Sequence, residues 1–161
     1  MGKIPLFALL LITASTYSFY ANGKSNSLPR ATLMQCKAIN KAQVAALFDR
    51  WNASLKTGDP RRVAHNYTHD AVLLPTLSSK VRLTDEERID YFKSFLKKGP
   101  VGRIDSRKIR IGCNDAIDTG NYTFSFKDGT KAAARFTFTY AWNGRAWLIT
   151  SHHSSALPAT Q

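Results

Sequence analysis

The sequence has little of several features that mark particular protein classes. Its 161 residues include only 9 Gly, 6 Pro and 2 Cys, and 11 acidic residues against 23 Lys and Arg. Collagen-like, coiled-coil and wholly disordered chains are excluded, because 3 Trp, 6 Tyr and 9 Phe are spread along the sequence. A chain of this length forms one globular domain, since two cores would need more residues.

The apolar run over 4–14 is too short to cross a membrane. Its 11 residues rise about 1.5 Å each in a helix, whereas the hydrocarbon layer is about 30 Å thick. The run follows Lys3 and precedes small residues, which is the layout of a secretory signal peptide. We therefore expect a leader over 1–21, cleaved after Ser18 or Ala21, no stable membrane span after cleavage, and a periplasmic or secreted protein. The alternative is a frayed apolar N-terminal helix.

The cysteine pair is interpreted in the light of this export. Cys36 and Cys113 are 77 positions apart, which is unlike the close spacing of a zinc or redox motif. In an oxidising compartment such a pair predicts a disulfide, which would stabilise the fold by roughly 4 kcal/mol in the chain-entropy model. Two independent buried thiols are the alternative.

The charge is strongly basic but scattered. The formal net charge is +12, and loss of Lys3 with the leader would leave about +11. No dense basic tract is present, so a solvated basic surface is expected and a nucleic-acid partner is not. Attachment to an acidic polymer is a further alternative, and it would weaken steeply with salt.

Polar, turn-rich residues over 22–37 predict a flexible tether, followed by a domain over 38–158 and a tail over 159–161. At its start, Asn40 and Gln43 resemble a capping box for a helix that ends at Gly58.

Two more helices are expected before the pattern changes. Pro60 can begin a short one that runs toward Tyr67, and Thr84 with Glu87 resembles a second capping box. Gly99 ends that third helix. A short apolar strand over 71–75 lies between these helices.

From Val101 onward the period becomes that of strands. The extended runs cover 101–113, 116–126, 131–142 and 146–155. Asp128-Gly129 and Asn143-Gly144 predict tight hairpins between the last three runs. The expected fold class is α+β: a cone-shaped, curved antiparallel sheet of four long C-terminal strands plus a short strand, covered on one face by about three N-terminal helices.

Strand alternation sorts the side chains into two sets. The aromatic set is Tyr122, Phe124, Phe126, Phe136, Phe138, Tyr140, Trp147, Ile149 and His153. The polar set is Thr119, Asn121, Thr123, Arg135, Thr137, Thr139, Thr150, His152 and Ser154. Neither set is typical of an ordinary solvated sheet, so we expect one face to line a pocket and the other to join two subunits.

Several segments resemble one known family. They are FDRWNASLKTGDPRRVAHNYTHDAVLLPT, ERIDYFKSFL, IRIGCNDAIDTGNYTF and YAWNGRAWLITSHHSSALP. Over roughly residues 38–158 the chain is similar to bacterial relatives of the calcium/calmodulin-dependent protein kinase II association domain, in the nuclear transport factor 2-like or cystatin-like superfamily. The resemblance implies a homo-oligomer, commonly a dimer, with a pocket between sheet and helices. It does not imply a kinase, because the phosphate-binding and catalytic motifs of phosphoryl transfer are absent from the sequence.

The resemblance also bears on the ligand. In the kinase domain an arginine follows a histidine on the last strand, and here Ser154 takes its place after His153. If the polar face lines the pocket, Arg135 and His152 form an anion-binding pair with Asn121, Ser154 and Tyr67 nearby. Alternatively that face is simply solvated, and Arg135 pairs with a carboxylate on a neighbouring strand.

Metal binding and acid/base catalysis are the two other kinds of chemistry to consider. Adjacent His152 and His153 project oppositely on a strand, so we expect no metal site and no cofactor. Relatives in the superfamily use a buried Asp, or a His and Asp pair, for proton transfer, and Asp70 and Asp118 are the plausible inward carboxylates beside a His152 base. We favour a dimeric module that binds a small polar or anionic ligand. The alternative is an acid/base enzyme of the isomerase, cyclase or dehydratase type.

Overall fold

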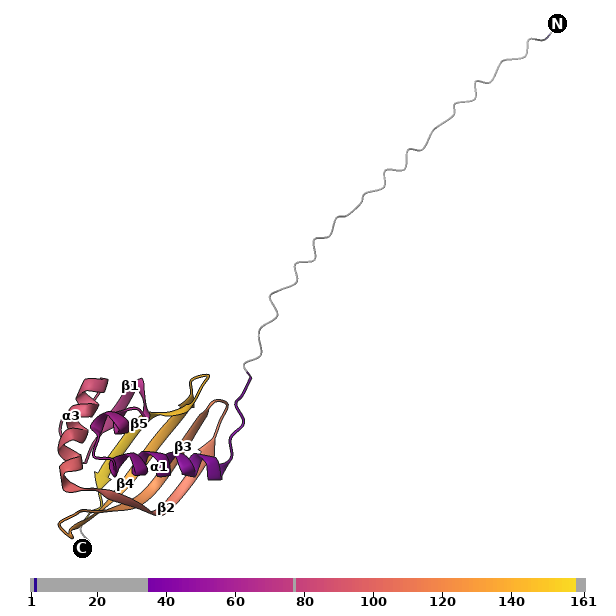
Figure 1. Cartoon of the computed structure of the whole chain (residues 1–161). Coiled ribbons are helices and arrows are strands. Elements are labelled where there is room, and N and C mark those ends of the chain that lie inside the picture. The colour runs from indigo at the N-terminus through magenta and orange to yellow at the C-terminus, as the bar shows by residue number, and fades with distance from the viewer. Residues whose placement is uncertain (1, 3–34, 77, 159–161) are drawn as a thin grey trace. The chain divides into compact units, whose positions relative to one another are not determined.

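The computed structural model describes residues 2, 35–76 and 78–158, so the expected leader and most of the expected tether lie outside the described residues (Figure 1). The elements are α1 (Lys41–Leu55), α2 (Pro60–Ala64), β1 (Tyr67–Leu74), α3 (Asp85–Phe95), a 3-10 turn η1 (Leu96–Lys98), β2 (Val101–Ile111), β3 (Asp115–Ser125), β4 (Lys131–Trp142) and β5 (Trp147–Ala156). In these described ranges no helix is long and apolar enough to cross a membrane.

One five-stranded sheet has the order β1-β5-β4-β3-β2. The four long strands form the predicted antiparallel meander. The short strand begins earlier than expected, at Tyr67, and pairs in parallel with β5, so the sheet is mixed rather than purely antiparallel. The parallel pairing is possible because the chain passes through α3 and the other strands before it reaches β5, and parallel neighbours need such a long crossover.

The helix ends follow the local sequence signals. The Asn40 side chain accepts from the Gln43 N–H and the Gln43 side chain accepts from the Asn40 N–H, which confirms the first capping box. At α3 only half of the expected box forms, because the Glu87 carboxylate accepts from the Leu83 N–H at 2.8 Å. The chain leaves η1 through Gly99, whose φ of 60° lies in the left-handed region.

The hairpins have the predicted positions but different turns. Asn143 N–H donates to Ala146, so the central pair is Gly144-Arg145, and only the glycine has positive φ. This places Gly at the first central position, as in a type II′ turn. The other hairpin is a longer loop, which the Phe126 N–H to Thr130 bond closes around Gly129.

The helices cover one face of the sheet, hereafter the inner face (Figure 1). Helix α1 buries five apolar side chains, which are Val44, Leu47, Phe48, Trp51 and Leu55. They pack on buried inner-face residues that include Tyr122, Phe136, Phe138 and Tyr140. The aromatic set is thus confirmed as the face under the helices, apart from His153.

A bulge in β5 overturns part of the predicted alternation. Tyr140 pairs with Ile149 but Thr139 pairs with Ser151, so Thr150 is an extra residue in β5. After the bulge the phase of the strand changes. His152 therefore lies buried on the inner face and His153 is exposed on the outer face, the reverse of the expectation.

A second bulge shapes β2 and requires a glycine on β3. The β2–β3 register shifts between Ile104 and Ser106. A Cβ at Gly120 would lie 2.0 Å from the Ser106 carbonyl oxygen. Only glycine allows the bulged backbone to approach this closely.

The predicted disulfide is present in the structure. Cys36 and Cys113 are bonded, with their Cα atoms 4.9 Å apart. Next to the bond, the Lys37 N–H donates to the Asn114 side chain and the Asn114 amide donates to the Gln35 carbonyl. The segment before α1 is therefore tied to the β2–β3 turn, which fits an oxidising rather than a cytoplasmic environment.

Candidate functional site

A cavity of about 430 Å³ lies between α1, α3 and the inner face of the sheet. Most of its wall is apolar and much of it is aromatic, from residues that include Trp51, Tyr91, Phe92, Phe95, Phe124 and Phe126. Ala132, Ala134 and Ala156 also line it. Because alanines occupy these positions on β4 and β5, the sheet leaves space there instead of filling it with side chains.

A chain of hydrogen bonds runs from Trp51 of α1 to His152 at the wall of this cavity. The Trp51 Nε1–H donates to the Tyr67 hydroxyl at 3.0 Å, and that hydroxyl lies 3.0 Å from His152 Nδ1. Indole N–H is only a donor, so the Tyr67 proton is free to point at Nδ1. We assign His152 the tautomer with its proton on Nε2 on this basis.

The chain continues along the cavity wall through hydroxyl groups. His152 Nε2 lies 3.5 Å from the Tyr122 oxygen, and the Tyr122 hydroxyl donates to Ser154 Oγ at 2.5 Å. Ser154 Oγ in turn lies 2.5 Å from Thr76 Oγ1. Tyr122, Ser154 and Thr76 therefore form a row of hydroxyls, hereafter the hydroxyl row, which lines the cavity.

The imidazole in this chain is neutral. His152 is 4% exposed, and burial lowers its pKa to about 3, with the nearby His153 adding to the effect. The ring stacks on Phe138 with the centroids 4.0 Å apart and contacts Trp51 edge-on. At neutral pH it is therefore a fixed hydrogen-bonding group and not the proton-accepting base expected from the sequence.

One cationic side chain lines the cavity. Lys98 comes from η1, and its ammonium lies 5.8 Å from the centroid of Phe126. Since its residue is exposed, the charge stays solvated at the cavity wall. It brings a positive charge to the wall of the cavity.

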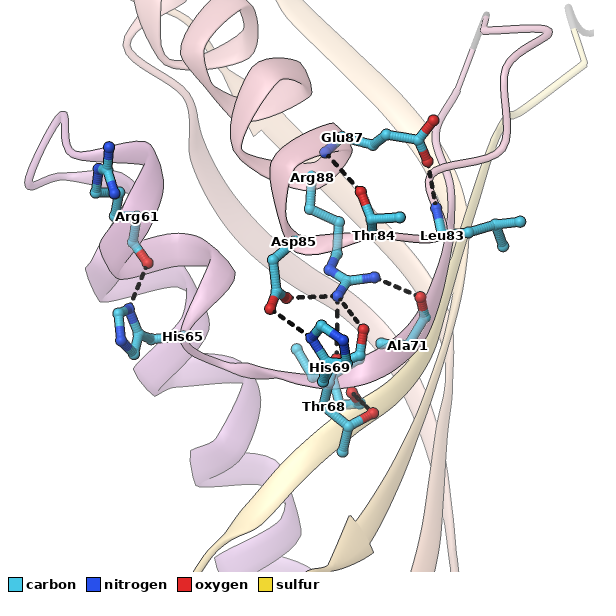
Figure 2. A network of polar contacts seen from close by, with 11 residues as sticks. Arg61, His65, Thr68, His69, Ala71, Leu83, Thr84, Asp85, Glu87 and Arg88 are labelled. Carbon is cyan, nitrogen blue, oxygen red and sulfur yellow. Dashed lines mark hydrogen bonds and ion pairs between the residues drawn. The ribbon is translucent and has the colours of Figure 1, made fainter.

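A buried arginine on α3 holds the strand that carries Tyr67 (Figure 2). Arg88 donates to the carbonyls of Thr68, His69 and Ala71 and to the Asp85 carboxylate. These carbonyls lie where the β1–β5 register shifts, so they lack regular strand partners. Arg88 is 0% exposed, and its guanidinium satisfies them in place of a neighbouring strand.

Replacing Arg88 with methionine is expected to lower the free energy of unfolding by about 3 kcal/mol, because it leaves the carbonyls of Thr68, His69 and Ala71 without their donor. Urea unfolding measures the change. His69→Ala is the control, since it removes only an exposed ring from Asp85 and should change stability far less. Equal effects of the two variants would contradict this role of Arg88.

The structure separates the residues that were expected to bind a ligand together. His152, Tyr67 and Ser154 meet on the inner face, whereas Arg135 and Asn121 lie around a hollow on the outer face. The expected anion-binding pair of Arg135 and His152 is therefore wrong as a pair, because the β5 bulge turns His152 inward.

The expected carboxylates are not beside the imidazole. Asp70 is exposed, so its expected inward position is wrong. Asp118 is buried on the inner face, as expected, but Phe138 lies between it and His152 in the register of β3, β4 and β5. A His152 base oriented by either carboxylate is not what the geometry supports.

Asp118 has a buried environment of its own. An oxygen of its carboxylate lies 3.0 Å from Arg107 Nη2, and the Arg107 guanidinium lies 5.7 Å from the Phe48 ring. Burial raises the pKa of Asp118 to about 6, although Arg107 acts in the opposite direction. The folded protein therefore binds a proton here more tightly than the unfolded chain does.

This raised pKa predicts a pH dependence of stability. The contribution of Asp118 is fully present below the ordinary pKa of an aspartate and is lost as pH rises through about 6. Between pH 4 and pH 7 the free energy of unfolding should fall by about 2 kcal/mol in the wild type relative to Asp118→Asn. Urea unfolding at both pH values measures this, and parallel pH profiles would contradict it.

Sequence reasoning missed three residues of the site. Trp51 lies in the helix expected after Asn40 but was not singled out, and Tyr122 was identified only as a member of the aromatic set. Thr76 lies in the loop after β1, where no periodicity applies. The indole N–H of Trp51 and the hydroxyl of Tyr122 could have indicated a polar site, because a buried Trp or Tyr usually has a hydrogen-bond partner.

The described residues contain no group of three or more His, Cys, Asp or Glu side chains that could hold a metal ion.

Comparison with known proteins identifies the family. Residues 40–158 match the calcium/calmodulin dependent protein kinase II association domain. A crystal structure from Xanthomonas campestris assigned to this domain is 44% identical, with 78% of this chain and 96% of that chain covered and a TM-score of 0.71. No curated protein matches.

More distant structures share the fold. The iota-carbonic anhydrase of a cyanobacterium, solved with bicarbonate, is 21% identical over 77% of this chain and 95% of that chain, with a TM-score of 0.67. A Streptomyces avermitilis protein classed as a dehydratase of the NTF2-like family is 14% identical over 73% and 96%, with a TM-score of 0.66. Family match, mixed sheet and helix-covered cavity agree, and the chain belongs to the calcium/calmodulin-dependent protein kinase II association domain family, with an NTF2-like, cystatin-like fold.

Proposed function

We propose that the cavity binds bicarbonate and that the protein interconverts carbon dioxide and bicarbonate. The observation that carries this proposal is the hydroxyl row at the end of an otherwise apolar cavity, fixed by a neutral imidazole. Apolar walls suit carbon dioxide, whereas hydroxyl groups and the Lys98 ammonium suit the product anion. The bicarbonate-bound fold neighbour is a carbonic anhydrase, which supports this choice of ligand.

The proposed reaction uses groups that both donate and accept hydrogen bonds. A water molecule held by Ser154 and Thr76 would attack the carbon of carbon dioxide, forming a new C–O bond. The electron pair of one C=O bond would move to its oxygen, which becomes anionic. The water proton would leave through the hydroxyls to buffer, and bicarbonate would remain beside the donors.

His152 has a positioning role in this scheme. Its Nδ1 accepts from Tyr67, so its Nε2–H is directed toward Tyr122. This orientation leaves the Tyr122 proton for Ser154, and the Ser154 proton for Thr76 or for a ligand. The row can then present a donor to an oxyanion without any change of protonation state.

Stopped-flow measurement of carbon dioxide hydration by the oxidised protein tests the proposal, together with a ¹³C NMR titration of bicarbonate. Turnover above the buffer rate is the expected result. Bicarbonate binding without turnover would overturn the enzymatic part and leave the binding module favoured by the sequence. Neither binding nor turnover would overturn both.

We further propose that the chain forms a dimer through the β1 edge of the outer face of the sheet. The family name refers to association. At this edge, apart from the hollow around Arg135, an apolar strip is formed by Val72, Leu74, Val81 and Leu83, which the Leu73–Arg82 bridge brings together. A second copy would remove this strip from water. Sedimentation equilibrium tests the proposal, and a monomer across the micromolar range would overturn it.

Export to the periplasm or the exterior is the remaining proposal. The Cys36–Cys113 bond and the leader-like sequence before the domain support it. Fractionation of cells that produce the full chain tests it, and protein found only in the cytoplasm would overturn it.

A further inference from the structure

We propose that the outer face of the sheet carries a second anion site, centred on Arg135 and suited to a phosphate or sulfate ion. The site is a hollow of about 320 Å³ on the three central strands. It lies on the opposite side of the sheet from the hydroxyl row and does not depend on the proposed carbonic anhydrase function.

The sheet register brings polar side chains together in two rows. Asn121, Arg135 and Ser155 are opposite one another on β3, β4 and β5. In the next row Thr119, Thr137 and His153 are opposite one another. Directly opposite residues have Cβ atoms about 5 Å apart, so the two rows form a compact group of polar side chains.

Most of the donors in this group are free to bind a ligand. Thr119 and Thr137 are engaged, since Thr119 donates to the Phe136 carbonyl at 2.9 Å and lies 3.1 Å from Thr137 Oγ1. Within the described residues, the side chains of Arg135, Asn121 and Ser155 have no hydrogen-bond or ion-pair partner. The alternative raised by the sequence, a carboxylate paired with Arg135, is thus not found among those residues.

The chemistry of the hollow selects its ligand. It is lined by a guanidinium, an amide, hydroxyls and an imidazole, and no carboxylate lines it. The planar fork of an arginine matches two oxygens of an oxyanion, and donors from the flanking strands can reach the others. An anion with three or four oxygens satisfies such a set better than a carboxylate with two. His153 lies opposite Thr137 in this group only because the β5 bulge turns its side chain to the outer face.

Isothermal titration of the full oxidised chain with inorganic phosphate tests the site, at two protein concentrations because the same face carries the proposed dimer contact. We expect Arg135→Gln to weaken binding at least roughly tenfold and Arg135→Lys to weaken it less, because lysine keeps the charge but not the fork. Arg145→Gln is the matched control, since Arg145 is an exposed arginine in the β4–β5 hairpin. It should bind phosphate as the wild type does.

Equal binding by wild type and Arg135→Gln, or no binding by a folded wild type at either concentration, would overturn the proposal. Ser154→Ala separates the two sites, because it changes the inner cavity and should leave the phosphate titration unchanged. Loss of phosphate binding in Ser154→Ala would also overturn an outer site. Absence of carbonic anhydrase turnover would leave this proposal untouched.

Discussion

Replacing Ser154 with alanine is expected to lower kcat/KM for carbon dioxide hydration by about a hundredfold, the loss typical of removing one donor from an oxyanion site. Ser154 lies in the middle of the hydroxyl row, where it links Tyr122 to Thr76. Alanine interrupts the row and leaves the Tyr122 proton without an acceptor. Stopped-flow kinetics measure the change, and circular dichroism confirms that the variant is folded.

Ser155→Ala is the matched control for this substitution. Ser155 is the next residue on β5, but its side chain lies around the outer hollow and not in the cavity. Its replacement should leave turnover unchanged. If both variants were as active as the wild type, the hydroxyl row would not be the reacting site. If both lost activity equally, the effect would come from the strand and not from the cavity.

The sequence predicted the fold well because the fold depends on local signals. Apolar side chains at helical spacing, the box at Asn40 and the glycines of the hairpins each act within a few residues. The four long strands accordingly begin and end within about two residues of the predicted positions. The antiparallel meander follows from these turns, because two strands that a tight hairpin joins pair with each other in antiparallel directions.

The candidate site was harder to predict because it depends on one inserted residue. The alternation of a strand has a period of two, so a bulge exchanges the faces of every residue after it. No residue type marks Thr150 as the extra one, and its effect is visible only in the pairing with β4. His152 and Ser154 were therefore both assigned to the wrong face, and Arg135 was expected to lie beside them although it lies on the opposite face.

Long-range partners were a second obstacle. Arg88 follows three acidic residues in the first turn of α3, where a solvated arginine would be ordinary. Its burial depends on carbonyls of β1, 17 to 20 positions earlier, which are free only because the β1–β5 register is irregular there. Such a partner set follows from the tertiary structure and leaves no pattern in the sequence near Arg88.

Removing the disulfide is expected to have the largest effect on stability. Cys36→Ser with Cys113→Ser opens a loop whose ends are 77 positions apart. In the chain-entropy model the free energy of unfolding falls by about 4 kcal/mol, because the unfolded chain regains the freedom that the bond denied it. The melting temperature should fall by roughly 10–15 °C.

Calorimetry of the double variant measures this change, and Asn114→Gly separates the bond from its surroundings. Asn114 ties the same segment by hydrogen bonds to Lys37 and Gln35, and its φ is 64°. Glycine removes those bonds without strain at positive φ, so that variant should lose about 1 kcal/mol or less. If Asn114→Gly were destabilised as much as the double variant, the hydrogen bonds and not the disulfide would hold the segment before α1 in place. A double variant as stable as the oxidised wild type would show that the chain is already restricted in its unfolded state.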